Sequence, residues 1–209
     1  VYCKITPHEG RIAATDTFRL AEQLIGPGKG LKETISFILP HRLAQEFVRV
    51  AGDISEVAVA LGENQIMFEC GGIKILSRLI EGNFPEYQAI IPKKIETSCY
   101  LKKEDLMGAV RTSSIFSSKL QDVGLRITSK EVEIAAANQE VGNFKTTIPA
   151  AVSGNEISLH FNYRYLLDGL NVMDEGEFYL GANSEHTPSI IKNKNDSSFT
   201  YVVMPIRIS

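Results

Sequence analysis

The residue types that most often carry out catalysis or bind metals are few and scattered in this chain. The histidines lie far apart, and none forms an H-x-x-x-H pair or adjoins a cysteine pair of the kind that binds zinc. The cysteines are also widely spaced, which is typical of free thiols in a reducing cytoplasm. We therefore expect a cytoplasmic protein with no metal and no cofactor. The residues concerned are His8, His41, His160, His186, Cys3, Cys70 and Cys99.

Isolated carboxylates and missing motifs argue against an enzyme. Asp16, Asp122 and Asp168 each lack a catalytic partner nearby in the sequence, so we interpret each as a cap or turn residue. The chain has neither a G-x-S-x-G nucleophile elbow nor a G-x-G-x-x-G nucleotide loop. We expect a non-catalytic protein, and a hydrolase whose active site assembles from distant residues stays open as an alternative.

Basic residues recur on the polar faces of three predicted helices, where they could contact phosphate. Such a surface would bind nucleic acid without sequence preference, because phosphate contacts carry no information about the bases. An ordinary solvated face is the alternative, and the net charge of −3 argues against binding by bulk electrostatics. The residues are His41, Arg42, Arg49, Lys103, Arg111 and Arg164.

The C-terminal segment Phe199–Ser209 is unusually apolar for a chain end. A final strand over Tyr201–Met204 explains its first part. The following Pro205–Ile208 must either dock on the body of the protein or line a surface pocket.

Three similar strand-helix units position these residues. Ile35–Val50, Ser98–Arg111 and Ile157–Met173 each alternate apolar residues before one aligned position and repeat them four apart after it. The aligned positions are Pro40, Lys102 and Asn162. Runs of strands separate the units, so we predict an α+β fold of repeated β-α-β-β-β units.

The 209 residues suffice for two domains, which we predict at 1–93 and 94–209. The segment Glu81–Lys94 has two prolines and little periodicity, so we interpret it as an extended linker. The first run of strands, Val1–Ile25, has no strand-helix unit before it. We therefore expect the chain to begin inside a domain.

Three segments together resemble signatures of one family. They are Ala14–Leu20 (ATDTFRL), Ile80–Tyr87 (IEGNFPEY) and Tyr201–Arg207 (YVVMPIR). In the same order and at compatible spacing, they are similar to the bacterial DNA polymerase III beta subunit, the replicative sliding clamp. The resemblance covers most of the family's middle domain and its whole C-terminal domain.

This resemblance implies a DNA-clamp fold, with helices on one face and antiparallel sheets on the other. It implies a non-catalytic processivity factor of DNA replication, in which two three-domain subunits form a ring that encircles duplex DNA. The basic residues at the helices would then tend toward the DNA channel, where loose contacts permit sliding. This implied set is His41, Arg42, Arg49, Lys102, Lys103, Arg111 and Arg164.

The resemblance also implies a partner-peptide pocket between the second and third domains. There the clamp tethers the DNA polymerase III catalytic subunit, the clamp loader and other proteins with a clamp-binding motif. Where the family often has a Gly-His pair, this chain has Thr17-Phe18, which predicts a bulkier pocket floor. Where the family often has a basic residue, this chain has Ala89, which removes one possible charge contact with the peptide. The implied pocket residues are Thr15, Thr17, Phe18, Arg19, Leu20, Pro85, Ile90, Asn162, Tyr165, Pro188, Val202, Val203, Met204, Pro205, Ile206 and Arg207.

The family's ring closure implies a homodimer interface at the apolar pair Ile115 and Phe116. The full-length protein would close a homodimeric ring, and we expect this chain by itself to be mainly monomeric. A carbohydrate-binding or other ligand-binding β protein with a similar repeat is a further alternative.

Overall fold

The computed structural model describes residues 1–52, 54 and 56–207, and its chain divides into two compact units. Unit 1 comprises Val1–Ala14 and Gln23–Pro85, and unit 2 comprises Thr15–Glu22 and Glu86–Ser209. After Pro85 the rest of the chain belongs to unit 2. The domain boundary predicted at residue 93 stays a prediction. None of the helices in the described ranges is long and apolar enough to cross a membrane.

Unit 1 contains a group of strands built around β1 (Tyr2–Ile5). This strand pairs antiparallel with β2 (Gly10–Thr15) on one side and with β4 (Ile35–Ile38) on the other. Strand β3 (Arg19–Ile25) lies next to β2 in the strand order. Its first part, up to Glu22, belongs to unit 2.

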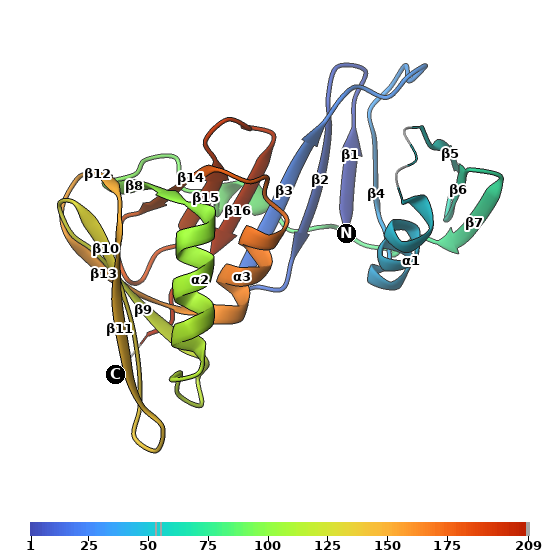
Figure 1. Ribbon diagram of the computed structural model, residues 1–209. Coiled ribbons are helices and arrows are strands. Elements are labelled where there is room, and N and C mark those ends of the chain that lie inside the picture. Colours follow the sequence, from blue (N-terminus) through green and yellow to red (C-terminus); the bar gives the residue numbers. More distant parts are fainter. Residues whose placement is uncertain (53, 55, 208–209) are drawn as a thin grey trace. The chain divides into compact units, whose positions relative to one another are not determined.

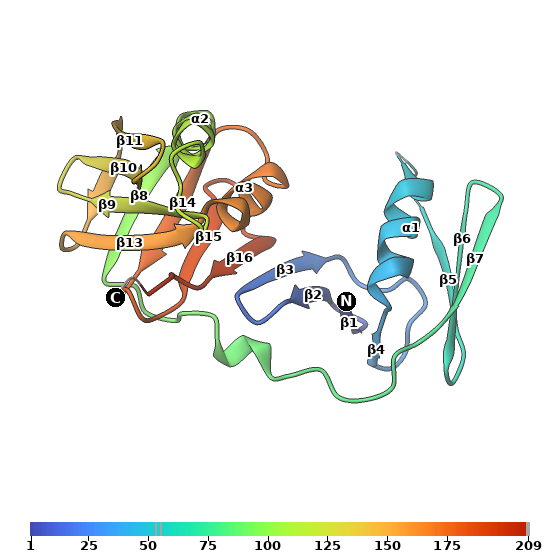
Figure 2. The same ribbon diagram turned by 90° about the horizontal axis from the view of Figure 1, so that it is seen from below.

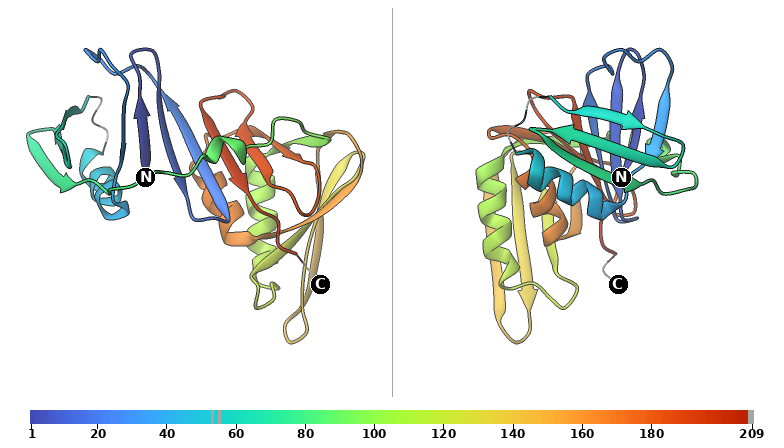
Figure 3. Two further views of the ribbon diagram at one scale, coloured as in Figure 1. Left: turned by 180° about the vertical axis from the view of Figure 1, so that it is seen from behind. Right: turned by 90° about the vertical axis from the view of Figure 1, so that its right-hand side faces the viewer.

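A single helix, α1 (His41–Ala51), accompanies a second sheet in the described part of unit 1. This sheet has the order β5 (Ala58–Leu61), β6 (Gln65–Cys70) and β7 (Ile73–Arg78). Figures 1 and 3 show the helix beside these strands, and the rings of Phe47 and Phe68 lie 4.7 Å apart. Burial of this apolar helix face, with Leu43 at its centre, holds the helix in place.

Unit 2 consists of two β-α-β-β-β halves that exchange their first strands. The first half contains β8 (Thr97–Lys102), α2 (Lys103–Ser114), β9 (Asp122–Ile127), β10 (Glu131–Asn138) and β11 (Gly142–Pro149). The second contains β13 (Ile157–Asn162), α3 (Tyr163–Asn171), β14 (Glu177–Ala182), β15 (Ser189–Asn193) and β16 (Phe199–Val203). Strand β13 pairs antiparallel with β9, and β8 pairs antiparallel with β14. The predicted repeat is therefore present.

The exchange gives two sheets with matching strand orders. One sheet is β11-β10-β9-β13, and the other runs β8-β14-β15-β16 and continues into β3. A short strand, β12 (Ala151–Ser153), extends the second sheet beyond β8. The sequence did not predict β12, because three residues are too few to show an alternating pattern.

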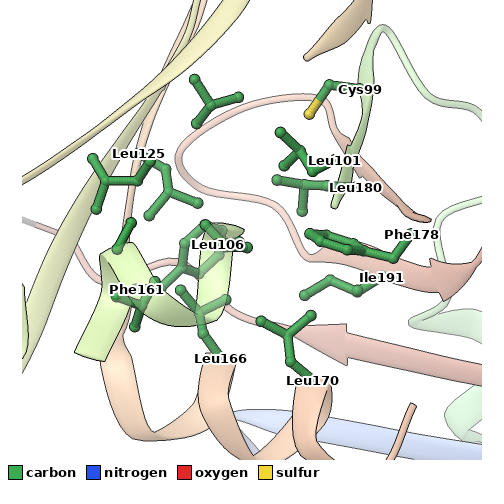
Figure 4. Packing of buried hydrophobic residues seen from close by; sticks show 14 of the residues in the cluster. Cys99, Leu101, Leu106, Leu125, Phe161, Leu166, Leu170, Phe178, Leu180 and Ile191 are labelled. Carbon is green, nitrogen blue, oxygen red and sulfur yellow. The ribbon is translucent and has the colours of Figure 1, made fainter. Parts of the chain in front are cut away.

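The core of unit 2 lies between the two helices and the two sheets. Alternation in β8 buries Cys99 and Leu101, while Leu106 of α2 and Leu166 and Leu170 of α3 are fully buried. Figure 4 shows the leucines of both helices converging on the side chains of β14 and β15. At about 25 cal/mol for each Å² of apolar surface, this burial is the main term that stabilises the unit.

The three aligned positions of the sequence repeat are all helix N-caps. Pro40, Lys102 and Asn162 immediately precede α1, α2 and α3. The side chain of Asn162 accepts a hydrogen bond from the backbone N–H of Arg164 at 2.9 Å, which satisfies one free donor of the first turn. Asn162, predicted to line the peptide pocket, is thus also the cap that starts α3.

Candidate functional site

A tight turn over Thr15–Arg19 carries the first residues of the candidate site. This turn lies entirely in unit 2. The carboxylate of Asp16 accepts hydrogen bonds from the backbone N–H groups of Phe18 and Arg19 at 3.2 and 3.1 Å. The hydroxyl of Thr15 donates to the carbonyl of Arg19 at 2.7 Å. The interpretation of Asp16 as a turn residue is therefore confirmed.

This turn forces Thr17 into a left-handed backbone conformation, with φ at 76°. Positive φ is costly for a β-branched residue, and such outliers persist only where the surrounding structure determines them. The cluster of hydrogen bonds around Asp16 supplies that constraint. The strained turn leaves the ring of Phe18 58% exposed to solvent.

Arg19 links the turn to helix α3. Its Nη1 donates to a carboxylate oxygen of Asp168 at 2.6 Å, and its Nε donates to Asp16 at 2.9 Å. The guanidinium carbon also lies 4.4 Å from the ring centre of Tyr165, in a cation–π contact. Burial disfavours the charged form, but the hydrogen bonds that the guanidinium makes to Asp168, Asp16 and Tyr201 outweigh this effect and raise the pKa of Arg19 above its ordinary value.

Tyr201 of β16 contacts α3 at two points and holds the first turn of this helix in place. Its hydroxyl donates to the backbone carbonyl of Tyr165 at 2.9 Å, and its ring lies against Gly169. Burial raises the pKa of the Tyr201 phenol to about 12, although the neighbouring Arg19 acts in the opposite direction. The phenol therefore remains protonated and can keep donating this hydrogen bond at neutral pH.

The apolar C-terminal segment, which the structure describes up to Arg207, docks on the turn and on β13; Ile208 of the predicted segment Pro205–Ile208 lies outside the described residues. The backbone N–H of Met204 donates to the carbonyl of Phe18 at 2.8 Å, and that of Ile206 donates to the carbonyl of His160 at 2.6 Å. The ring of Phe18 in turn stacks on Tyr165, with ring centres 6.4 Å apart. Strand β16 ends at Val203, so Met204–Ile206 form a docked tail and do not continue the strand.

The structure brings most of the predicted peptide-site residues into unit 2. Leu20, Val202 and Pro205 are buried, and Val203 is fully buried in the core, so we leave Val203 out of the proposed surface. Pro85 belongs to unit 1. The partly or fully exposed members in unit 2 are Thr15, Thr17, Phe18, Arg19, Ile90, Asn162, Tyr165, Pro188, Met204, Ile206 and Arg207.

Sequence reasoning missed two residues that organise the site. Asp168 was interpreted as a cap or turn residue, and this is wrong, because it lies within α3 and forms an ion pair with Arg19. Tyr201 is predicted to lie in a final strand and in a signature segment, but it is not among the predicted site residues. The available signal was spacing, since Asp168 lies three residues after Tyr165 and therefore on the same side of a helix. In the described ranges, no group of three or more His, Cys, Asp or Glu side chains is arranged to hold a metal.

The predicted DNA-facing residues lie on all three helices, apart from Lys102, which ends β8 and is the N-cap of α2. His41, Arg42 and Arg49 are exposed on α1 in unit 1, and Arg49 pairs with Glu46 at 2.6 Å. In unit 2, helices α2 and α3 lie side by side (Figure 2), where Arg111 donates to Asn171 at 3.5 Å. The exposed members of unit 2 are Lys102, Arg111 and Arg164.

Lys103 does not lie on a solvated face. Its ammonium is buried, where it donates to the backbone carbonyl of Met173 at 2.6 Å and to Glu175 at 2.9 Å. The first position of α2 points this side chain toward the segment that follows α3. We therefore leave Lys103 out of the proposed DNA-facing set and assign it a structural role.

Replacing Lys103 by methionine should lower the free energy of unfolding by about 1–3 kcal/mol, because it leaves the buried Met173 carbonyl without its donor. Urea unfolding followed by circular dichroism measures this loss. The neighbouring Lys102→Met is the matched control, and because Lys102 is exposed we expect a change within about 0.5 kcal/mol. Equal stability of the two variants would show that the buried ammonium makes no net contribution.

Exposed apolar side chains lie in the segment after α2 and just before β11, and we refer to them as the apolar patch. Ile115 is 66% exposed, and Leu120 and Val141 are also largely exposed. Phe116 stacks on Phe144 of β11 with ring centres 5.9 Å apart. Strand β11 is the edge strand of its sheet, so an unpaired row of backbone groups adjoins this patch.

Comparisons with known proteins agree on one family. The model of the DNA polymerase III beta subunit, central domain, matches residues 1–86, and the model of its C-terminal domain matches residues 88–207. The beta sliding clamp of Staphylococcus aureus is 26% identical over 198 residues, which cover 93% of this chain and 52% of that protein. The beta sliding clamp of Staphylococcus epidermidis is 27% identical with the same coverage. The chain thus spans about half the length of the curated relatives it matches.

Solved structures confirm the predicted α+β fold of the clamp type. The crystal structure of the DNA polymerase sliding clamp from Bacillus subtilis aligns with a TM-score of 0.94 at 24% identity, covering 100% of this chain and 56% of that one. The clamp from Pseudomonas aeruginosa aligns with a TM-score of 0.92 at 23% identity, covering 99% and 58%. With two family models that together match nearly the whole sequence, this chain belongs to the DNA polymerase III beta subunit family.

Proposed function

We propose that this chain acts in DNA replication as the central and C-terminal part of a sliding clamp. In this role it is a non-catalytic, cytoplasmic processivity factor that encircles duplex DNA and tethers the polymerase. The family models and the relatives named beta sliding clamp support this role. The observation that carries the proposal is the docking of Met204 on the carbonyl of Phe18, beside the Arg19–Tyr165 contact.

The proposed tethering site has the chemistry to bind a short apolar peptide. Phe18 and Tyr165 offer aromatic faces, and the half-buried Met204 adds a flexible apolar side chain that adapts to different partners. Arg207 is exposed and can contact a polar end of the peptide. A peptide this short should bind in the micromolar range, at about −8 kcal/mol. The partners of this kind are the polymerase III catalytic subunit, the clamp loader and other proteins with the same motif.

The proposed contact with DNA uses the exposed basic residues of the helices. Arg49 and Arg111 each already have a polar partner on their own unit, Glu46 and Asn171. Because these partners compete with phosphate for the two arginines, we expect their contacts with DNA to be weak. Weak contacts suit a surface along which duplex DNA must move, since tight phosphate binding would oppose sliding. The residues proposed are His41, Arg42, Arg49, Lys102, Arg111 and Arg164.

The apolar patch at Ile115 is the proposed homodimer interface. An exposed aliphatic side chain, the Phe116–Phe144 stack and the free edge of β11 together can pair with a strand and an apolar surface of a second subunit. The proposed partner surface belongs to the family's first domain, which the matched ranges do not include.

The peptide site is tested by measuring the binding of an apolar pentapeptide with a leading glutamine. We expect micromolar binding to the wild-type chain by fluorescence polarisation. Phe18→Ala and Met204→Ala should each weaken it about tenfold or more, because anchor side chains contribute most of the binding energy.

Val172→Ala is the matched control, because Val172 is an exposed aliphatic residue at the far end of α3 and its loss should leave affinity unchanged. A scrambled pentapeptide controls for composition. Retained affinity in both Phe18→Ala and Met204→Ala would contradict the site. Absence of any binding to the wild type would favour the alternatives, a ligand-binding β protein or a hydrolase.

A further inference from the structure

The segment 86–96 includes most of the predicted linker Glu81–Lys94, and its start is fastened to unit 2 by a side-chain hydrogen bond. Tyr87 opens a short 3-10 helix, η1 (Tyr87–Ala89), and its side chain is only 5% exposed. The Tyr87 hydroxyl donates to a carboxylate oxygen of Glu22 at 2.5 Å, and Glu22 is itself buried on β3. A hydrogen bond to a buried carboxylate is among the stronger side-chain contacts in proteins.

A second fastening holds the end of the same segment. The side chain of Asn183 donates to the carbonyl of Lys94 and accepts from the backbone N–H of Glu96, both at 2.8 Å. Between these contacts the side chain of Ile95 lies over Gly181, where an added Cβ would approach it to 3.0 Å. The segment is therefore held to unit 2 at both ends.

Ile90 lies in the span between the two fastenings and is 48% exposed. Its backbone N–H donates to the carbonyl of Tyr87 at 3.0 Å, so the position of Tyr87 determines where Ile90 is presented. On β3, Leu20 and Glu22 lie on the same face, because side chains alternate along a strand. The Tyr87–Glu22 contact thus fastens η1, and with it the backbone of Ile90, to the face of β3 that carries Leu20 and Glu22.

We propose that Tyr87 and Glu22 are positioning residues of the peptide site. They do not touch the peptide. Their hydrogen bond fixes η1, and η1 presents Ile90 as an apolar contact for a side chain of the docked peptide. This inference rests on the proposed function, since it assigns the pair a role in binding the same class of apolar peptide.

The short length of η1 explains why it needs an external fastening. A single 3-10 turn has few hydrogen bonds of its own and poor geometry, so it opens easily unless tertiary contacts hold it. Without the Tyr87 hydroxyl, the ring can stay buried while the turn samples other positions. The cost should then appear as weaker peptide binding and as local opening of η1 that increases more than global unfolding does.

The test compares four variants of the full chain. Tyr87→Phe and Glu22→Leu remove the hydrogen bond, and Glu22→Gln keeps an acceptor for the Tyr87 hydroxyl. Tyr100→Phe is the control, because it removes a hydroxyl from an exposed tyrosine of β8 whose ring contacts Tyr179 and Lys194. We expect hydrogen exchange at the Ala89 and Ile90 amides to rise about tenfold in Tyr87→Phe and Glu22→Leu.

In the same two variants, the affinity for the apolar pentapeptide with a leading glutamine should fall about three- to tenfold, mainly through faster dissociation. Glu22→Gln should restore both quantities toward the wild type, which a general loss of packing would not allow. Unchanged exchange at Ala89 and Ile90 in Tyr87→Phe would overturn the proposal. If the wild type binds no peptide, the proposed function fails while the exchange measurement still tests the fastening.

Discussion

Replacing Gly154 by alanine should destabilise unit 2 by about 4 kcal/mol or more, which is a severe effect for one methyl group. Gly154 has φ at 101°, and an added Cβ would lie 2.0 Å from the backbone carbonyl oxygen of Glu96 and 2.8 Å from the Cα of Thr97. Neither group can move freely, because the Thr97 hydroxyl donates to the carbonyl of Asn155 and the Glu96 N–H is held by Asn183. Urea unfolding and soluble yield measure the loss.

Gly176→Ala is the matched control for this prediction. Gly176 has a similar φ of 118°, but an added Cβ would meet no atom within 4 Å. Its alanine variant therefore suffers backbone strain alone, which costs about 1–3 kcal/mol. The difference between the two variants isolates the collision with the start of β8. If both lose the same stability, the backbone around Gly154 relaxes and the predicted collision does not occur.

Gly169→Ala should destabilise unit 2 by about 2 kcal/mol even though alanine is the better helix former. An added Cβ would lie 2.5 Å from two carbon atoms of the Tyr201 ring. That ring is buried, and its hydroxyl is bonded to the carbonyl of Tyr165, so it cannot rotate away without breaking this contact. The displacement should also weaken peptide binding, because Tyr165 carries the contacts of Phe18 and Arg19.

Gly108 in α2 is the control position, because its replacement by alanine should stabilise the protein. It is exposed, and an added Cβ there meets nothing within 4 Å. Gly108→Ala should raise the free energy of unfolding by about 0.5–1 kcal/mol through helix propensity alone. Thermal unfolding of the two variants side by side checks the opposite signs. Stabilisation by Gly169→Ala would mean that the Tyr201 ring is not confined as described.

Much of the fold could be predicted because its signals are local. Alternation before Pro40, Lys102 and Asn162 and the four-residue spacing after them depend only on which side chains share a face. All three positions became helix N-caps, since the change from strand to helix must occur where the period changes. The exchange of β8 and β13 between the halves carries no local signal, because it depends on pairing between distant segments.

The sequence predicted the exposed residues of the candidate site. It did not predict the residues that hold these exposed side chains in position. Phe18, Arg19 and Met204 belong to segments that resemble the family's signatures, and Tyr165 belongs to the third strand-helix unit. The structure brings these segments together in unit 2. Asp168 was misinterpreted, since its partner Arg19 lies 149 residues away in the sequence. Lys103 shows the same limit, because the periodicity of a helix does not reveal that a later segment covers its first turn.

The amino-acid sequence alone therefore determined the repeat, the helix starts, the apolar chain end and the family, since each follows from the order of neighbouring residues. The tertiary structure decided which charges are paired and which backbone groups meet. Arg19 binds Asp168, Tyr87 binds Glu22, and Met204 docks on Phe18, although no spacing in the sequence links these residues. The physical reason is that hydrogen bonds and ion pairs depend on distances of a few ångströms, which distant segments acquire only when the core folds.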